Sequence, residues 1–385
     1  MTALVATTTE TVNTIGLEAE RRWKELDAAA RLPDDLQQAA LDGGLFRTLV
    51  PVELGGVGGT PTDWFRIGVE LARHEPSVAW VVTQGAAELG WIAAGGNESW
   101  ARELLEDPLG ASASSVAGVG KIVLGEESTL EGRWGFNSGA HGATWIGGLS
   151  VVADSALPDG APDIRFGWVP ADRAEIVEDW DPIGMRGSGS HSTVIRRQEI
   201  DPRWVFSPFE KTANDRGPYR CVVGNGNWPI TGSVAATQLG AARRAIDEAE
   251  RLAHEKIPAP EMVRLADMST VQRALICAEG RWNAARAGVE RELELMWEQA
   301  NGPQELSREQ RLRLFAANAH ADNEAVRIVN DMCEITGTAA INLSSPLARM
   351  RRDSQALHGH LGTNGAAIEH AGKVKLGLLD EHRRV

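Results

Sequence analysis

Hydrophobic positions follow a helical period at both ends of the chain and an alternating pattern in its middle. Up to about residue 107, the apolar spacing and the placement of Gly and Pro predict helices, with residues 51–59 forming a Gly-rich loop. This region is therefore expected to be helical. The predicted helices cover residues 15–30, 33–43, 61–74, 77–94 and 100–106.

From about residue 110 to 207, short apolar runs separated by Gly, Asp and Pro predict strands. The runs are 121–124, 129–136, 148–153, 165–169, 175–177 and 193–200. Helical spacing then returns, at 233–255, 261–299, 307–336, 346–357 and 369–379.

Ser307 and Gln310 stand in the positions of a capping box. Long helices joined by short turns are typical of a bundle. We therefore expect an α+β protein with three domains: an N-terminal helical domain (1–107), a middle β domain (108–215) and a C-terminal four-helix bundle (216–385).

The composition narrows the class of partner. The 385 residues carry a formal net charge of −14, which argues against nucleic acid and against an anionic membrane surface. No apolar run approaches the roughly 20 residues that span a bilayer, and the Thr-rich start lacks the features of a secretory signal. The three cysteines are far apart and no metal-binding motif occurs, so we expect a cytoplasmic protein without a metal site.

Two candidate segments lie among the predicted strands. In Phe136–Trp145, Gly and Ser would let backbone N–H groups approach a planar ligand, which Trp145 could cover. Asp181–His191 combines Gly, Ser and Arg in a way that suits an anion or the polar edge of a ring. Taken alone, each segment is more typical of a turn or a hairpin loop than of a binding site.

The third candidate segment, Leu347–Asn364, follows the helix start at Pro346. It contains several arginines together with His358 and His360, whose side chains should diverge because they are two residues apart. Basic residues near a helix end also complement the helix dipole, so this segment too has an ordinary structural interpretation.

The order of these segments resembles the acyl-CoA dehydrogenase superfamily. A helical region is followed by a β region with an S-G-x-x-x-A-x-W segment and a G-M-R-G-S-G-S segment, and then by a bundle ending in P-L-A-R-x-x-R-D. The resemblance extends from about residue 15 to 380. It implies a flavin between the β domain and the bundle, and a homotetramer.

The residues that depart from the dehydrogenase pattern favour a different reaction. Ser344 stands where those dehydrogenases carry a catalytic Glu, and Leu361 replaces the Glu of their Glu-Gly-Thr segment. A serine hydroxyl does not act as that base unaided, because its pKa is too high. This argues against dehydrogenation of an acyl-CoA.

The same positions resemble the two-component flavin monooxygenases of this fold, in which a His follows the Arg-Asp pair by seven residues. Asp353 and His360 have this spacing. The resemblance implies that His360 and Ser138 are catalytic, with Ser138 near flavin N5. The remaining residues fall into a flavin-binding set (Ser138, Trp145, Arg186, Gly187, Ser188, Gly189, Ser190) and a substrate-pocket set (Trp80, Gln84, Trp91, His358).

The implied reaction begins with a separate NAD(P)H:flavin reductase, which supplies FADH2 or FMNH2. O2 then forms a flavin C4a-hydroperoxide, which transfers one oxygen atom to a small aromatic or polycyclic substrate. The alternatives are a dehydrogenase or oxidase whose base is Glu248 or Glu279, a monooxygenase acting on nitrogen or sulfur, and a non-catalytic subunit.

Tryptophan is concentrated where this site is expected. Eleven of the 13 tryptophans lie at or before Trp228, and only Trp282 and Trp297 come later. Most are expected to be core residues.

Overall fold

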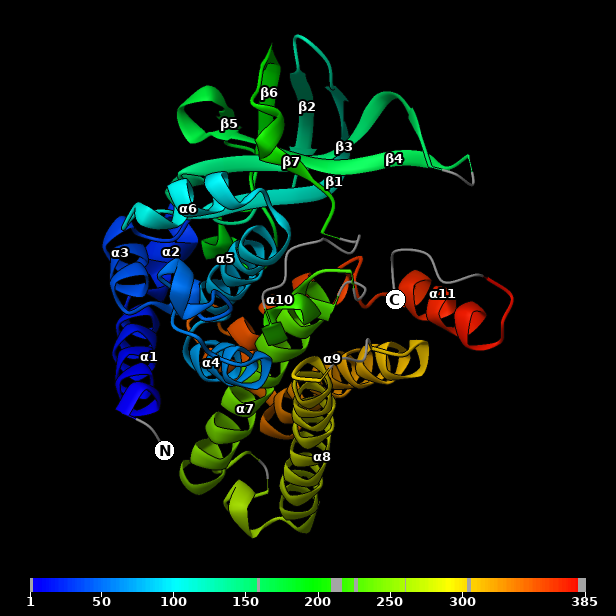
Figure 1. Cartoon of the computed structure of the whole chain (residues 1–385). Helices are drawn as coiled ribbons and strands as arrows, with labels where there is room; N and C mark the ends of the chain where they lie inside the picture. Colours follow the sequence, from blue (N-terminus) through cyan, green and yellow to red (C-terminus); the bar gives the residue numbers. More distant parts are fainter. Residues whose placement is uncertain are drawn as a thin grey trace.

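The computed structural model describes residues 3–157, 160–208, 217–224, 228–259, 261–302 and 306–379. Helices come first, a β-sheet follows, and helices return, which confirms the predicted fold class. The sheet covers one end of the molecule, and the long helices lie beneath it (Figure 1).

Polar side chains cap the last three of the N-terminal helices, α4, α5 and α6. Thr60 and Asp63 form a capping box at the start of α4, and Asn97 caps α6. The predicted helix at 15–30 is two helices, because the chain breaks at Arg22. The bounds are α1 (Ala3–Arg21), α2 (Trp23–Ala29), α3 (Asp34–Asp42), α4 (Pro61–His74), α5 (Pro76–Gly95) and α6 (Glu98–Glu106).

The described strands form one seven-stranded sheet with the order β5-β6-β2-β1-β3-β4-β7. All neighbouring pairs are antiparallel except β1 and β3, which are parallel. The strand predicted at 121–124 begins already at Ser112. The sequence pattern missed its first part because residues 112–120 are rich in Ser, Ala and Gly and show no alternation of apolar and polar positions. The bounds are β1 (Ser112–Val123), β2 (Thr129–Gly135), β3 (Trp145–Ala156), β4 (Pro162–Pro170), β5 (Glu175–Val177), β6 (Ser192–Glu199) and β7 (Val205–Phe206).

The C-terminal helices pack into a bundle in which α9 contacts α7, α8 and α10. Ser307 and Gln310 form the predicted capping box. The helix predicted at 261–299 begins only at Ser269, since residues 261–268 are irregular apart from a 3-10 turn at Leu265–Asp267. The bounds are α7 (Trp228–Glu255), α8 (Ser269–Ala300), α9 (Arg308–Thr336), α10 (Pro346–His358) and α11 (Gly365–Lys375).

No helix in the described part of the chain is both long and apolar enough to cross a membrane.

A buried carboxylate joins the bundle to the β region. Asp353 of α10 accepts a hydrogen bond from the backbone N–H of Met185, with 2.6 Å between N and Oδ1. Arg349 lies one turn earlier on α10, 3.7 Å from Asp353, and forms an ion pair with Glu75 at the start of α5. These side chains are almost fully buried, so a charged network shielded from water links the three parts of the chain.

Gly184 lets this loop approach the α10 backbone. A Cβ at this position would lie 2.4 Å from the carbonyl carbon of Arg352 and 2.6 Å from the nitrogen of Asp353. Since neither backbone atom can move away cheaply, only Gly fits here.

We therefore expect Gly184→Ala to lower the free energy of unfolding by about 1–3 kcal/mol, because the added methyl group separates the loop from α10. Urea denaturation measures this change. The matched control is Gly280→Ala, on the exposed face of α8 with nothing within 4 Å, which should raise stability by roughly 0.5–1 kcal/mol. Equal stability of the Gly184 variant and the parent would contradict this account of the junction.

Candidate functional site

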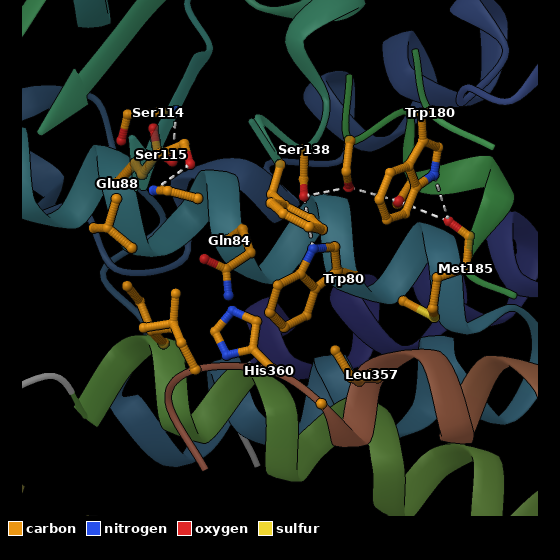
Figure 2. Close-up of a pocket in the computed structure, with 18 of the residues that line it drawn as sticks. Trp80, Gln84, Glu88, Ser114, Ser115, Ser138, Trp180, Met185, Leu357 and His360 are labelled. Carbon is orange, nitrogen blue, oxygen red and sulfur yellow. Dashed lines mark hydrogen bonds between the residues drawn. The ribbon is translucent and has the colours of Figure 1, made fainter. Parts of the chain in front are cut away.

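A cavity of about 430 Å³ lies where the first helices, the sheet and the bundle meet. Its volume is within the range that holds small ligands and cofactor rings. Figure 2 shows the side chains that point into it. The lining residues are Trp80, Gln84, Glu88, Trp91, Ser114, Ser115, Val116, Ala117, Phe136, Ser138, Phe166, Trp180, Met185, Ser188, Ser190, Ile230, Ala356, Leu357, Gly359, His360 and Leu361.

One wall of the cavity comes from a single helix. Trp80, Gln84 and Glu88 are four residues apart on α5, so they lie on the same helical face, and Trp91 continues it. The rest of α5 is apolar and almost entirely buried, which fixes the rotation of this face toward the cavity.

A chain of hydrogen bonds runs along the sheet side of the cavity (Figure 2). The Trp80 Nε1–H donates to Ser138 Oγ at 2.8 Å, and Ser138 Oγ lies 2.6 Å from Ser190 Oγ. Ser190 Oγ is 2.7 Å from Ser188 Oγ, which donates to the Met185 carbonyl oxygen at 2.7 Å. The three predicted serines are thus brought together, although 52 residues separate Ser138 from Ser190.

The ends of this chain fix its direction. An indole N–H can only donate and a carbonyl oxygen can only accept. Each hydroxyl proton must therefore point toward Met185, from Ser138 to Ser190 and from Ser190 to Ser188. Ser138 consequently has no proton left for the cavity and presents only a free lone pair to a ligand.

His360 faces the chain across the cavity. Its ring lies edge-on to Trp80, with 5.1 Å between centroids. Removal from water lowers the pKa of His360 to about 4, so the ring is neutral at physiological pH. The backbone N–H of Gly362 donates to Nδ1 at 3.1 Å, which places the proton of the neutral ring on Nε2.

Glu88 is the one carboxylate on the α5 wall and was not among the predicted residues. Its oxygens accept hydrogen bonds from Ser112 Oγ and from the Ser114 N–H, each at 2.9 Å. Burial raises the pKa of Glu88 to about 7, despite these two bonds. The sequence did contain a signal, since Glu88 is the one charged residue in the twenty residues of α5.

Other lining residues also escaped the sequence interpretation. Phe136 is 65% exposed and has a left-handed backbone (φ 56°), which a bulky residue rarely adopts. Trp180 packs edge-on against Phe136, with 5.8 Å between centroids. The sequence shows that Phe136 precedes the Asn-Ser-Gly turn, but it does not show that the Phe136 side chain is exposed.

Trp145 does not line the cavity. Its ring packs against Trp100 and Trp204, with centroids 5.5 and 5.0 Å away. The strand places it in the aromatic core between α6 and the sheet. The proposed covering of a flavin by Trp145 therefore has no support in this arrangement.

His358 also lies outside the cavity lining. Its Nδ1 lies 3.3 Å from both carboxylate oxygens of Asp322, which also accepts from Gln238 and Thr363. As predicted from their spacing, His358 and His360 diverge, and it is His360 that faces the cavity.

Three of the predicted flavin-binding residues shape the loop instead of lining the cavity. Arg186 donates to the Asp27 and Pro182 carbonyls and pairs with Asp181. Gly187 lies against Leu26 and Ser77, and Gly189 has φ +55°. They hold Ser188 and Ser190 in place.

Three side chains of the kinds that bind metals, His141, Glu178 and His191, lie close together behind this loop. His141 Nε2 is 2.7 Å from Glu178, and His191 Nε2 is 3.2 Å from the other oxygen of Glu178. However, the Trp180 N–H donates to His191 Nδ1, so Nε2 carries the proton and offers no lone pair to a metal.

Two protein-family models match the chain. Residues 7–109 match the acyl-CoA dehydrogenase N-terminal domain, and residues 233–365 match the acyl-CoA dehydrogenase C-terminal domain. Together the two matches cover more than half of the chain.

Similar proteins span nearly the whole chain. Indole-3-acetate monooxygenase of Acinetobacter baumannii is 25% identical, over 92% of this chain and 90% of the relative. The oxygenase component of the FADH2-dependent resorcinol hydroxylase of a Rhizobium species is 26% identical, over the same shares. The structure of XiaF from Streptomyces in complex with FADH2 and glycerol has a TM-score of 0.89 at 22% identity, over 99% of this chain and 98% of that one.

The raised pKa of Glu88 predicts a pH-dependent stability. Between its ordinary value near 4.5 and about 7, the folded protein binds this proton more strongly than the unfolded chain does. Stability should therefore fall as the pH rises through this window, by up to roughly 3 kcal/mol from this group. Glu88→Gln has no such proton.

Urea denaturation of the parent and of Glu88→Gln at pH 5, 6, 7 and 8 measures this contribution as a difference between the two proteins. We expect the parent to lose stability relative to the variant as the pH rises. Parallel curves would contradict a raised pKa at Glu88.

Proposed function

Because the chain belongs to the acyl-CoA dehydrogenase superfamily, and its relatives are reduced-flavin-dependent monooxygenases, we propose that it transfers one oxygen atom from O2 to a small aromatic or polycyclic substrate. The observation that carries the proposal is the directed hydrogen-bond chain that leaves Ser138 facing His360 across an apolar cavity.

The polar groups of the cavity fit a reduced flavin. Reduced flavin carries a proton on N5, and the free lone pair of Ser138 would accept it. Oxidised flavin has no proton there, so its N5 would face a lone pair. Ser138, Ser188 and Ser190 would hold the ring edge, and the bound reduced flavin would supply the electrons that activate O2.

The walls of the cavity would exclude water during the reaction. Trp80, Trp91 and Phe166 contribute large apolar surfaces, and Leu357 and Leu361 close the bundle side. A dry site matters because water promotes unproductive release of hydrogen peroxide.

His360 would act as a neutral hydrogen-bond donor. Its Nε2–H is available because Nδ1 already accepts from Gly362. This donor would orient the oxygen atom being transferred or a polar group of the substrate.

A dehydrogenase of the same fold is less well supported. Neither base proposed for it lines the cavity, since Glu248 is paired with Arg251 and Glu279 with Arg243. Two bundle arginines that could otherwise contact a CoA phosphate are engaged in ion pairs, Arg243 with Asp247 and Arg244 with Glu20.

The proposal includes a separate NAD(P)H:flavin reductase, because the relatives are oxygenase components of two-component systems. It also includes a homotetramer, as the family resemblance implies. Exposed apolar side chains such as Ile341, Leu343 and Leu376 are compatible with such an assembly.

We expect His360→Ala to retain reduced-flavin binding while the hydroxylation rate falls about 100-fold or more. Product formation with a reductase and a panel of aromatic substrates measures the rate, and anaerobic titration measures binding. His320→Ala, an exposed position on α9, is the control. Hydroxylation at the parental rate would rule out this role for His360.

The purified protein should be colourless and should bind reduced flavin at least about tenfold more tightly than oxidised flavin, because Ser138 offers a lone pair and no proton. Ser138→Ala should lose this preference and release more hydrogen peroxide. Ser155→Ala, exposed at the far end of β3, should behave like the parent. A yellow protein with tightly held oxidised flavin would favour the dehydrogenase or oxidase instead.

A further inference from the structure

The wall formed by α5 contains a polar pair that the proposed oxygen chemistry does not use. Gln84 and Glu88 lie one helical turn apart and both line the cavity (Figure 2). The Nε2 of Gln84 is buried and has no hydrogen-bond partner among the residues that the structure describes. An unpaired buried donor is costly, so a ligand that accepts from it would gain binding energy.

The two hydrogen bonds that Glu88 accepts leave further carboxylate lone pairs for a ligand in the cavity. The Ser114 N–H can only donate to Glu88, and the Ser112 hydroxyl also donates, because Ser112 Oγ itself accepts from Trp168 Nε1 at 3.1 Å. Since these partners only donate, Glu88 has lone pairs for a further donor in the cavity.

The charged groups that line this cavity disfavour an anionic ligand. Among its described lining residues there is no Lys or Arg, and the only titratable groups are Glu88 and His360. The contacts of Glu88 from β1 and β4, namely Ser112, Ser114 and Trp168 through Ser112, carry no charge. An anionic ligand would therefore meet no cation, and its nearest charged neighbour would be another carboxylate.

On the basis of the proposed function, we infer that Glu88 is a charge filter for the substrate. The cavity selects neutral aromatic molecules whose N–H or O–H group donates to Glu88, while Gln84 donates to an adjacent acceptor. Aromatic carboxylates are rejected, although they have the same ring.

The filter depends on pH in a defined direction. Glu88 loses its proton as the pH rises through about 7, whereas His360, with a pKa of about 4, stays neutral across this range. Rejection of a carboxylate should therefore be stronger at pH 8 than at pH 6, and no other described lining residue titrates between these values.

The test compares two probes that share a ring, 3-methylindole and indole-3-acetate, by isothermal titration of the full-length protein at pH 6 and pH 8. We expect the parent to prefer 3-methylindole at least about tenfold at pH 8, and the preference to fall about threefold or more at pH 6. Glu88→Gln should bind indole-3-acetate more tightly than the parent at pH 8, and its preference should no longer change between pH 6 and pH 8. Glu248→Gln, a buried carboxylate outside the cavity, should keep the parental ratio.

Equal affinities of the parent for the two probes at pH 8, failure to bind 3-methylindole, or an unchanged ratio in Glu88→Gln would each overturn the filter. If Glu88→Gln does not fold, the pH dependence of the parent decides. Oxygen transfer to both probes, measured in parallel with reduced flavin, separates the two proposals. Selective binding without oxygen transfer contradicts the proposed function alone, whereas equal hydroxylation of both probes contradicts the filter alone.

Discussion

The hydrogen bond from the Met185 N–H to the Asp353 carboxylate determines the form of the site. Met185 has a left-handed backbone (φ 58°), which a non-glycine residue adopts only when its surroundings require it. Burial raises the pKa of Asp353, which would favour loss of its charge, and Arg349 opposes that rise. Arg349 is in turn held by Glu75 at the start of α5, so the helix that lines the cavity and the loop that carries the serines share one anchor.

The same anchor gives the hydroxyl chain its end point. Met185 accepts the last hydrogen bond of the chain through its carbonyl oxygen, while its N–H is held by Asp353. Fixing the two peptide groups that flank the Met185 Cα fixes the orientation of Ser188, and through it the orientations of Ser190 and Ser138. Ser138, which we propose faces the flavin, thus owes its acceptor character to a bundle helix that does not line that part of the cavity.

Burial explains why the two titratable groups of the cavity behave unlike their free counterparts. His360 is neutral and Glu88 is only about half ionised near pH 7, because the apolar walls disfavour charge. A neutral imidazole and a half-ionised carboxylate interact through directed hydrogen bonds more than through long-range fields. Recognition in this cavity therefore depends on where protons lie.

Sequence reasoning could predict the fold class because the order of helical and strand patterns is visible along the chain, and it singled out the Gly-Ser segments whose serines meet at the cavity. It also identified His360 by its spacing from Asp353. It could not predict the pairing of Glu75 with Arg349, which are 274 residues apart, since nothing local identifies a partner at that distance.

Other errors have equally physical causes. Trp145 was expected at the flavin because it ends a Gly-rich segment, yet the strand that begins there turns its ring into the aromatic core. The helix expected from residue 261 begins at Ser269, because hydrophobic spacing alone does not specify where a helix starts. Glu88 was missed because a single charge in an apolar helix does not disturb the helical pattern.

The face of α5 that carries Trp80, Gln84, Glu88 and Trp91 has an evolutionary consequence. The serines and His360 belong to other elements, so under the proposed function substitutions at positions 84 and 88 would change which molecules enter without altering the groups proposed to face the flavin. Selection for a new substrate would then change side chains on one rigid helix, at positions one turn apart, while the residues proposed for the oxygen chemistry stay the same. Such a division lets a single scaffold diversify quickly, and it identifies two positions at which directed evolution should begin.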